Sequence, residues 1–292
     1  MNEPTLRTGP GPWRQAWQRL CRHRLALACA LVLVLLAAAA ALLPWLSPYD
    51  YATPDWDRLF RDPSWRSTHP LGTDNLGRDV LVRVMWGCRI SLLVGLVATL
   101  VSVGIGVAWG TAAGYLGGRV DSVMMRAVDV LYSLPFIPLV IVLSVIFGRS
   151  FLLVFVAIGA VSWLDLARIV RGQTHALRQR EFIEAAMALG VSAPAMIARH
   201  LLPNLLGIVI VQATLTIPSV ILYEALLSFL GLGVRAPLTS LGSLVADGTI
   251  SLQSHPYLLL APAVALSLII FCCNVLGDGL RDAFEPDTAE RS

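Results

Sequence analysis

Six long runs of apolar residues, separated by polar segments, dominate the hydropathy pattern of this chain. A run of about 20 apolar residues forms a helix long enough to cross the roughly 30 Å hydrocarbon core of a bilayer. The pattern therefore predicts an all-α integral membrane protein with about six transmembrane helices. The predicted spans are Leu25–Leu43, Ile90–Ala113, Val128–Phe147, Phe151–Leu166, Leu205–Leu227 and Tyr257–Leu276.

The polar segments between the runs suggest how the chain is organised. The first run exceeds the 7–15 apolar residues of a typical signal-peptide core, so we interpret it as an uncleaved anchor. The prediction is an N-terminal segment 1–24, an anchor helix 25–46, a loop 47–89, a five-helix core 90–276 that includes a polar loop 168–204, and a tail 277–292.

The distribution of arginine predicts the orientation in the membrane. Basic residues in short loops favour the cytoplasmic side, and the long loop 47–89 balances its arginines with aspartates. Both termini and loop 168–204 are therefore predicted to be cytoplasmic, and loop 47–89 external. The cytoplasmic set would be Arg7, Arg14, Arg19, Arg22, Arg24, Arg119, Arg126, Arg168, Arg171, Arg178, Arg180, Arg199, Arg281 and Arg291.

Composition excludes several classes of protein. Of the 292 residues, 56% are hydrophobic and 14% are charged, whereas soluble domains carry about 25% charged residues. No lysine occurs, so a phosphate-binding Walker A loop is excluded and with it ATP hydrolysis by that route. Arginines at membrane edges do not form the water-facing basic patch of a nucleic-acid-binding protein.

The sequence also lacks the usual signatures of a membrane enzyme or a metal site. Neither HExxH nor Gly-x-Ser-x-Gly occurs, and the five cysteines show no CxxC spacing. Residues 72–79 lack EF-hand spacing, so a turn cluster at the outer end of the second span is expected there rather than a calcium site.

Charged residues in or near the spans suggest local pairing, with one exception. Spacing of three residues predicts the pairs Arg126–Asp129 and Asp165–Arg168 on single helices. Glu224 has no such partner, and carboxylates in membranes usually face a cavity or another chain. A role in a translocation pathway and a role at a helix end or subunit interface both remain open for it.

Small residues and prolines add two expectations about packing. Gly95, Gly104, Gly106 and Gly110 in the second span predict close contact with a neighbouring helix. Prolines within the later spans are compatible with kinked helices in a packed bundle or with a moving gate; the sequence does not choose between them.

Loop 168–204 is too polar for the membrane but rich in helix-forming residues. We predict one helix over Thr174–Leu189, ended by Gly190 in the left-handed C′ position. Ser192 would cap a second helix, which ends before Pro203. Such a helix–turn–helix could be a solvated hairpin or a knob with an alanine-rich tip that presses into a partner.

The residues of this loop resemble a known motif. Glu184-Ala185-Ala186, then Gly190, then Leu202-Pro203 have the spacing of the EAA loop of ABC-importer permeases, although His200 replaces the usual isoleucine. Three more segments resemble signatures of one branch, the C-type permeases of dipeptide/oligopeptide importers, which also includes nickel and glutathione permeases. These segments are His69–Asp79 (HPLGTDxxGRD), Leu227–Gly233 (LSFLGLG) and Leu276–Asp282 (LGDGLRD).

The resemblance implies a type I ABC importer permease fold (MetI-like), located as a multi-pass protein in a bacterial inner membrane. It implies a second homologous permease as partner, two ATPase subunits that bind ATP and magnesium and receive the EAA loop, an extracytoplasmic solute-binding protein and surrounding lipid. This chain itself would hold no cofactor or metal and would not be an enzyme. Glu184 would contact the ATPase and Gly190 would orient it.

Several alternatives stay open at this stage. The substrate could be a dipeptide, an oligopeptide, nickel or glutathione. Residues 237–242 lack the tryptophan of the Pro-Ser-Trp-Gly element that the family commonly carries there, so substrate detail does not transfer through that loop. An ATP-independent channel or a membrane assembly factor would also be apolar and polytopic.

Overall fold

The computed structural model describes residues 12–147, 151–233 and 237–284, and these residues are almost entirely helical. The elements, in chain order, are α1 (Pro12–Arg22), α2 (Arg24–Leu46), η1 (Trp56–Arg58), α3 (Val80–Leu116), α4 (Gly118–Ser133), α5 (Phe136–Phe147), α6 (Phe151–Arg178), α7 (Glu181–Ala188), α8 (Ala193–Met196), η2 (Ile197–Leu201), α9 (Leu202–Phe229), α10 (Leu241–Ile250) and α11 (Tyr257–Phe284).

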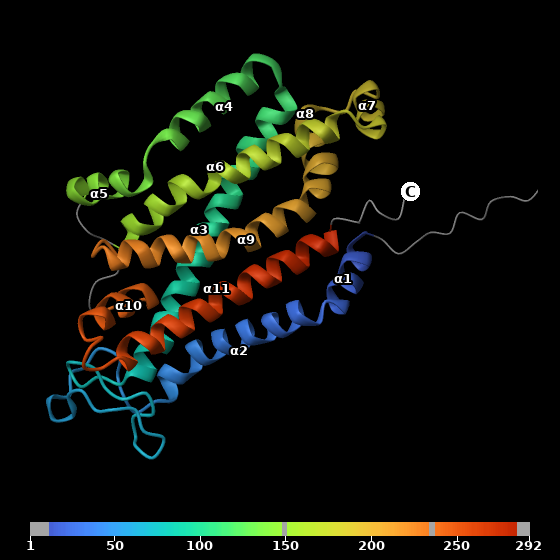
Figure 1. Cartoon of the computed structure of the whole chain (residues 1–292). Coiled ribbons are helices and arrows are strands. Elements are labelled where there is room, and N and C mark those ends of the chain that lie inside the picture. Colours follow the sequence, from blue (N-terminus) through green and yellow to red (C-terminus); the bar gives the residue numbers. More distant parts are fainter. Residues whose placement is uncertain (1–11, 148–150, 234–236, 285–292) are drawn as a thin grey trace, which may run out of the picture.

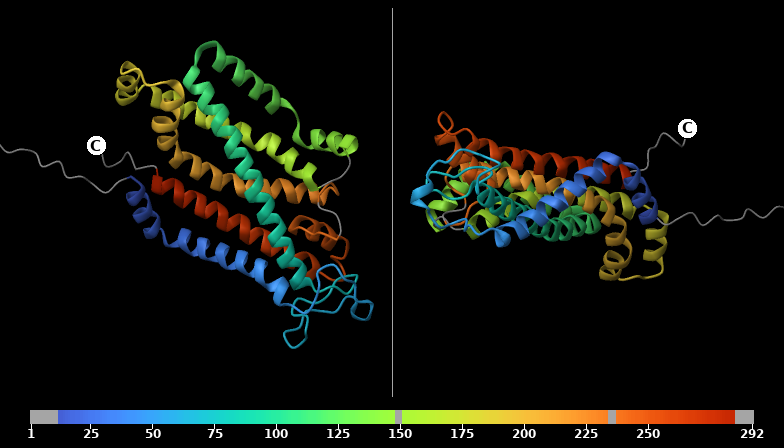
Figure 2. Two further views of the ribbon diagram at one scale, coloured as in Figure 1. Left: turned by 180° about the vertical axis from the view of Figure 1, so that it is seen from behind. Right: turned by 90° about the horizontal axis from the view of Figure 1, so that it is seen from below.

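The long helices form a slab that α3 crosses. In Figure 1, α2, α11, α9 and α6 lie side by side in this order, and α3 runs diagonally across them, packed against each of the four. Figure 2 shows that α3 covers one face of this layer. Helices α7 and α8, α1 and the end of α11 gather at one end of the slab, and residues 47–79 lie at the other.

Four helical segments among the described residues are long and apolar enough to cross a membrane, namely α2, α3, the continuous stretch Ala193–Phe229, and α11. They contain the first, second, fifth and sixth predicted spans. The fourth predicted span lies in α6. The prediction of a single helix over Val128–Phe147 is wrong, because the chain leaves helical geometry at Leu134 and restarts at Phe136. Pro135 disfavours helical geometry in the residue before it, which explains the break.

Other helix boundaries also differ from the sequence-based ones. Helix α3 begins at Val80, ten residues before the predicted start, because Asp79 caps it by accepting the Val82 N–H at 2.8 Å. Helix α11 continues to Phe284 and so includes the first eight residues of the predicted tail 277–292. Helices α1 and α10 were not predicted; α10 begins with a capping box formed by Ser240 and Ser243.

The predicted close contact of the α3 glycines with a neighbouring helix is confirmed for Gly95, Gly106 and Gly110. A Cβ added at Gly110 would lie 2.5 Å from the Ala167 carbonyl oxygen, and one at Gly106 would lie 2.9 Å from Leu166. Gly95 is similarly close to Ile221 of α9. At Gly104 the prediction is wrong, since no atom lies within 4 Å of an added Cβ.

Residues 72–79 form the predicted turn cluster, which lies at the N-terminal end of α3. The Asp74 carboxylate accepts the N–H groups of Leu76 and Arg78, both at 2.9 Å, and pairs with the guanidinium groups of Arg78 and Arg83. His69 Nδ1 lies 2.7 Å from Asp79 Oδ2. Buried charges are therefore paired here, and the loop is fixed to the helix that it precedes.

Candidate coupling site

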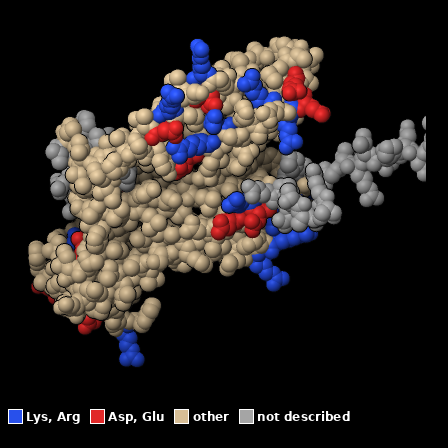
Figure 3. All heavy atoms as spheres, turned by 45° about the horizontal axis from the view of Figure 1, so that its top comes forward, with Lys and Arg blue, Asp and Glu red and all other residues tan. Residues whose placement is uncertain are grey.

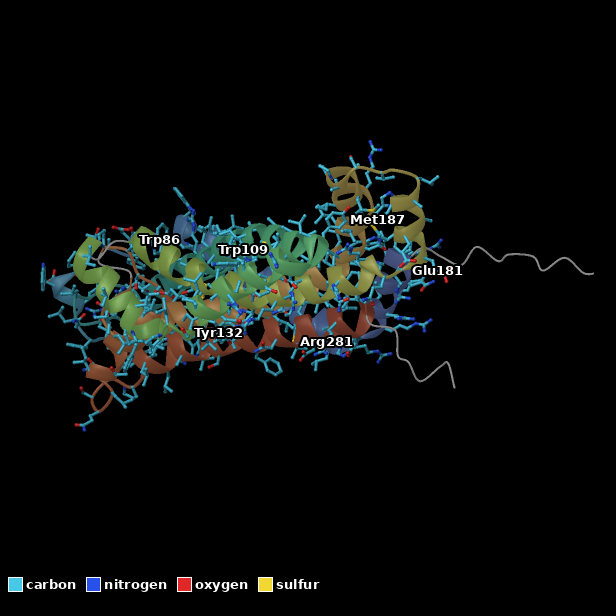
Figure 4. All side chains as sticks on the ribbon, turned by 90° about the horizontal axis from the view of Figure 1, so that it is seen from above. Trp86, Trp109, Tyr132, Glu181, Met187 and Arg281 are labelled. Carbon is cyan, nitrogen blue, oxygen red and sulfur yellow. The ribbon has the colours of Figure 1, made fainter. Side chains whose placement is uncertain are left out.

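The residues that resemble the EAA loop form a hairpin that projects from one end of the slab. Glu181 and Met187 mark it in Figure 4. Its first helix differs from the predicted one. Residues 174–178 belong to α6, residues 179–180 are not helical, and α7 covers only Glu181–Ala188. Gly190 then has φ +78°, as predicted for a C′ residue.

The turn after α7 is a Schellman motif. The Gly190 N–H donates to the Met187 carbonyl at 3.0 Å, and the Val191 N–H donates to the Ala186 carbonyl at 3.2 Å. Ser192 precedes α8 but makes no side-chain cap hydrogen bond, so that detail of the prediction is wrong. The backbone of the hairpin is therefore defined by Gly190, which adopts a left-handed conformation that glycine accepts most readily.

One face of α7 packs inward onto the body of the protein. Ile183 is fully buried and Ala186 is 9% exposed. Both belong to an apolar cluster with Met196 of α8, Leu201 of η2 and Leu205 of α9. This cluster also contains residues of α6, so it connects the hairpin to both α6 and α9.

The opposite face of the hairpin carries exposed side chains. Glu184, Ala185 and Gly190 are exposed, so the Glu-Ala-Ala triplet is divided, with only Ala186 facing inward. Phe182 is 48% exposed and Leu189 is 85% exposed. Sequence reasoning missed these two, although apolar residues in a polar loop are a recognisable signal. An exposed apolar patch on a projecting element is typical of a binding surface.

The two residues that close the motif lie where η2 passes into α9. Leu202 is half-buried and Pro203 is exposed at the start of that helix. Pro203 and Asn204 line an open pocket of about 340 Å³ with Trp13, Arg281 and Phe284. The motif therefore begins in the exposed hairpin and ends at the first residues of α9, where the hairpin joins the body of the protein.

Ion pairs hold α4 against the α6 segment that leads to the hairpin. Arg171 donates to both carboxylate oxygens of Asp121, at 2.6 and 2.5 Å, and Arg168 donates to Asp129 at 2.7 Å. The predicted pairing within single helices is wrong, because Asp129 and Arg168 pair with each other across the two helices. The hydrogen bonds from Arg171 hold the pKa of Asp121 below its ordinary value.

Glu224 lies at a junction of three helices. Its carboxylate is 0% exposed and accepts hydrogen bonds from Ser228 Oγ at 2.7 Å and from Ser91 Oγ of α3 at 3.1 Å. Ser240, at the start of α10, lies 3.3 Å from Ser228 Oγ, and the Leu241 N–H donates to Ser91 Oγ at 3.2 Å. The side chain therefore joins α3, α9 and α10 in this conformation and reaches no open space.

Comparison with known proteins matches most of the chain to transport proteins. Residues 104–290 match the family described as binding-protein-dependent transport system inner membrane component, and residues 11–63 match the N-terminal TM domain of oligopeptide transport permease C. The oligopeptide transport system permease protein OppC of Escherichia coli K12 is 52% identical over 278 residues, which is 95% of this chain and 92% of that relative.

More distant relatives extend the match. The dipeptide transport system permease protein DppC of Bacillus subtilis is 43% identical over 274 residues, covering 94% of this chain and 85% of the relative. A solved inward-facing structure of the MetNI methionine ABC transporter matches with a TM-score of 0.51 at 22% identity, covering 69% of this chain and 98% of that one. The fold is thus MetI-like, and the chain belongs to the family of binding-protein-dependent transport system inner membrane components.

Proposed function

We propose that this chain is the permease subunit of an ATP-driven importer of di- and oligopeptides in a bacterial inner membrane, and that it forms half of the translocation pathway. The other half would come from a second, homologous permease. The relatives that cover nearly the whole chain carry the names of oligopeptide and dipeptide permeases, which favours peptides over nickel or glutathione.

The hairpin around α7 would receive the force of ATP hydrolysis. Its outer face offers Phe182 and Leu189 for burial against another protein, and Glu184 lies exposed on the same helix. Its inner face contributes Ile183 and Ala186 to an apolar cluster that also includes residues of α6 and α9. A partner that moves the outer face would therefore move both helices, as alternating access requires. We assign this contact to one of two ATPase subunits.

The chain itself would be non-catalytic. Without lysine it lacks the residue that a Walker A loop uses to reach the β- and γ-phosphates, so ATP and magnesium would bind only to the ATPases. An extracytoplasmic solute-binding protein would deliver the peptide to the end of the slab that carries residues 47–79. A pathway role for Glu224 would require α10 to separate from α3 and α9, because these helices enclose its carboxylate.

The observation that carries this proposal is the projecting hairpin with an exposed apolar outer face and an inner face packed onto two long helices. The test is reconstitution in proteoliposomes with the sister permease, the ATPases and the binding protein. Uptake of a labelled oligopeptide should require ATP and every subunit, and the purified chain alone should hydrolyse no ATP. Peptide flux that persists without the ATPases would identify a channel instead and refute the proposal.

A further inference from the structure

Helix α1 is a short amphipathic helix attached to the end of α11. Ala16 and Leu20 are buried in an apolar cluster with Ala283 of α11. The ring of Trp13 meets that of Phe284 edge to face, with centroids 5.3 Å apart. These contacts fix α1 to the same end of the slab as the coupling hairpin.

Only half of the apolar side of α1 is covered by the residues that the structure describes. At 100° per residue, Trp17 and Cys21 continue the apolar arc that Ala16, Leu20 and Trp13 begin. Trp17 is 65% exposed and Cys21 is exposed. A tryptophan on a helix at the end of a membrane bundle is typical of the interface between headgroups and acyl chains.

The polar side of α1 carries positive charge that forms no ion pair among the described residues. Arg14, Arg19 and Arg22 are exposed, as is Arg24 at the start of α2, and none of the four forms an ion pair with another residue that the structure describes. No acidic residue occurs between Glu3 and Asp50 in the sequence. The surface therefore has the charge that binds phosphate groups.

The chain turns sharply between α1 and α2. His23 separates the two helices, and its Nδ1 caps α2 by accepting the Ala26 N–H at 3.1 Å. Figure 1 shows α1 leaving the axis of α2, and Figure 3 shows basic side chains standing out at this end of the molecule. Because α2 has the length and hydropathy of a membrane span, a helix that leaves its axis at this end would lie near the membrane surface.

We propose that α1 is an interfacial helix that binds the headgroups of anionic phospholipids, with Trp17 inserted at the acyl boundary and Arg14, Arg19 and Arg22 on the phosphates. The combination of an apolar arc containing tryptophan and an arginine-rich polar arc is that of interfacial helices. The neighbouring surface supports lipid rather than protein as the occupant, since Leu25 of α2 is 55% exposed and only 17% of the apolar window of α2 is buried in this chain.

Cys21 provides a native probe for the test. It is the exposed cysteine, and Cys29, Cys88, Cys272 and Cys273 are buried, so a thiol-reactive, polarity-sensitive fluorophore attaches to α1. The labelled full-length chain is placed in nanodiscs of phosphatidylcholine with increasing fractions of phosphatidylglycerol. The emission should shift to the blue as the anionic fraction rises, and added salt should reverse part of the shift.

Charge variants test the assignment to arginine. Each arginine near an anionic surface strengthens association about fivefold, so Arg14→Gln/Arg19→Gln/Arg22→Gln should lower the apparent affinity for phosphatidylglycerol by about two orders of magnitude. The matched variant Arg14→Lys/Arg19→Lys/Arg22→Lys keeps the charge and should retain the response. Trp17→Ala should reduce insertion equally in neutral and anionic nanodiscs.

Three results would overturn the proposal. One is a wild-type emission that is the same in neutral and anionic nanodiscs. Another is a glutamine triple variant that still responds as the wild type does. The third is an emission that ignores lipid but shifts when the ATPase subunits are added, which would make a protein the occupant of α1. Counting retained lipids by native mass spectrometry checks that the glutamine variant is folded and that its loss is specific for anionic lipid.

Discussion

Replacement of Gly190 by valine tests the coupling role of the hairpin directly. Gly190 has φ +78°, and no atom lies within 4 Å of an added Cβ, so the cost arises from backbone conformation rather than from a clash. A left-handed conformation costs an ordinary residue about 1–2 kcal/mol. Abandoning it would lose the two hydrogen bonds of the Schellman turn, at about 0.5–1.5 kcal/mol each.

The cost of about 1–2 kcal/mol for the left-handed conformation lowers the population of the native turn by a factor of about 5–30. ATP-driven peptide uptake by the reconstituted importer should fall by a similar factor, while insertion of the protein into the membrane stays normal. Gly190→Asn distinguishes the effect of the backbone conformation from the effect of a side chain at the contact surface, because asparagine tolerates the left-handed conformation. If only the turn matters, the asparagine variant should retain most of the uptake. If the partner needs a bare backbone there, both variants should fail.

The assay compares co-purification of the ATPases, stimulated ATP hydrolysis and peptide uptake for the two variants and the wild type. Gly110→Val serves as a packing control, since its Cβ would lie 2.5 Å from the Ala167 carbonyl oxygen. It should reduce the amount of folded protein, because overpacking costs about 1–3 kcal/mol. The milder contacts at Gly95 involve flexible side chains and predict a smaller loss. A Gly190→Val importer with full uptake would refute the coupling role.

Three further predictions address other parts of the structure. Glu224→Ala should destabilise the purified protein by about 1–3 kcal/mol, since serine hydroxyls would lose their buried acceptor, and Glu224→Gln should cost less; equal melting temperatures for the two variants would contradict this. Because Arg171 lowers the pKa of Asp121 below 3.8, the ionised carboxylate stabilises the fold above about pH 4, and this contribution is lost as the pH falls through the lowered pKa. Thermal melting between neutral pH and about pH 3 should therefore show a steeper loss for the wild type than for Asp121→Asn. A cysteine placed at Ser192 should react with an impermeant reagent only from the cytoplasmic side and one at Trp65 only from outside; the reverse pattern would disprove the orientation.

Much of the helical framework could be predicted, because a bilayer requires long apolar runs. The same requirement hides detail. Residues 128–147 are apolar on both sides of Pro135, so hydropathy gave no sign that α4 and α5 are separate helices. Helix α1 was missed for the opposite reason, since its arginines suggested only a polar segment. Its tryptophans, at amphipathic spacing, were the available signal.

The candidate sites divide in a similar way. The Gly190 turn was predictable because its signal is local in sequence. The partners of Glu224 were not, since Ser91 lies 133 residues away and a serine in an apolar run has no distinctive spacing. Ser228 is the exception. It follows Glu224 by four residues and therefore lies on the same helix face.

The 37 residues of α3 make it about 55 Å long at 1.5 Å per residue, far more than the thickness of the hydrocarbon core. No proline interrupts it, and its two ends are held by different parts of the protein, the turn cluster around Asp74 at one and α6 at the other. If a helix of this length rotates as a unit about one end, a tilt of about 5° displaces its other end by about 5 Å. If α3 tilts as a single unit, movements at the two ends of the protein would be coupled through this helix without a relay of contacts between other residues.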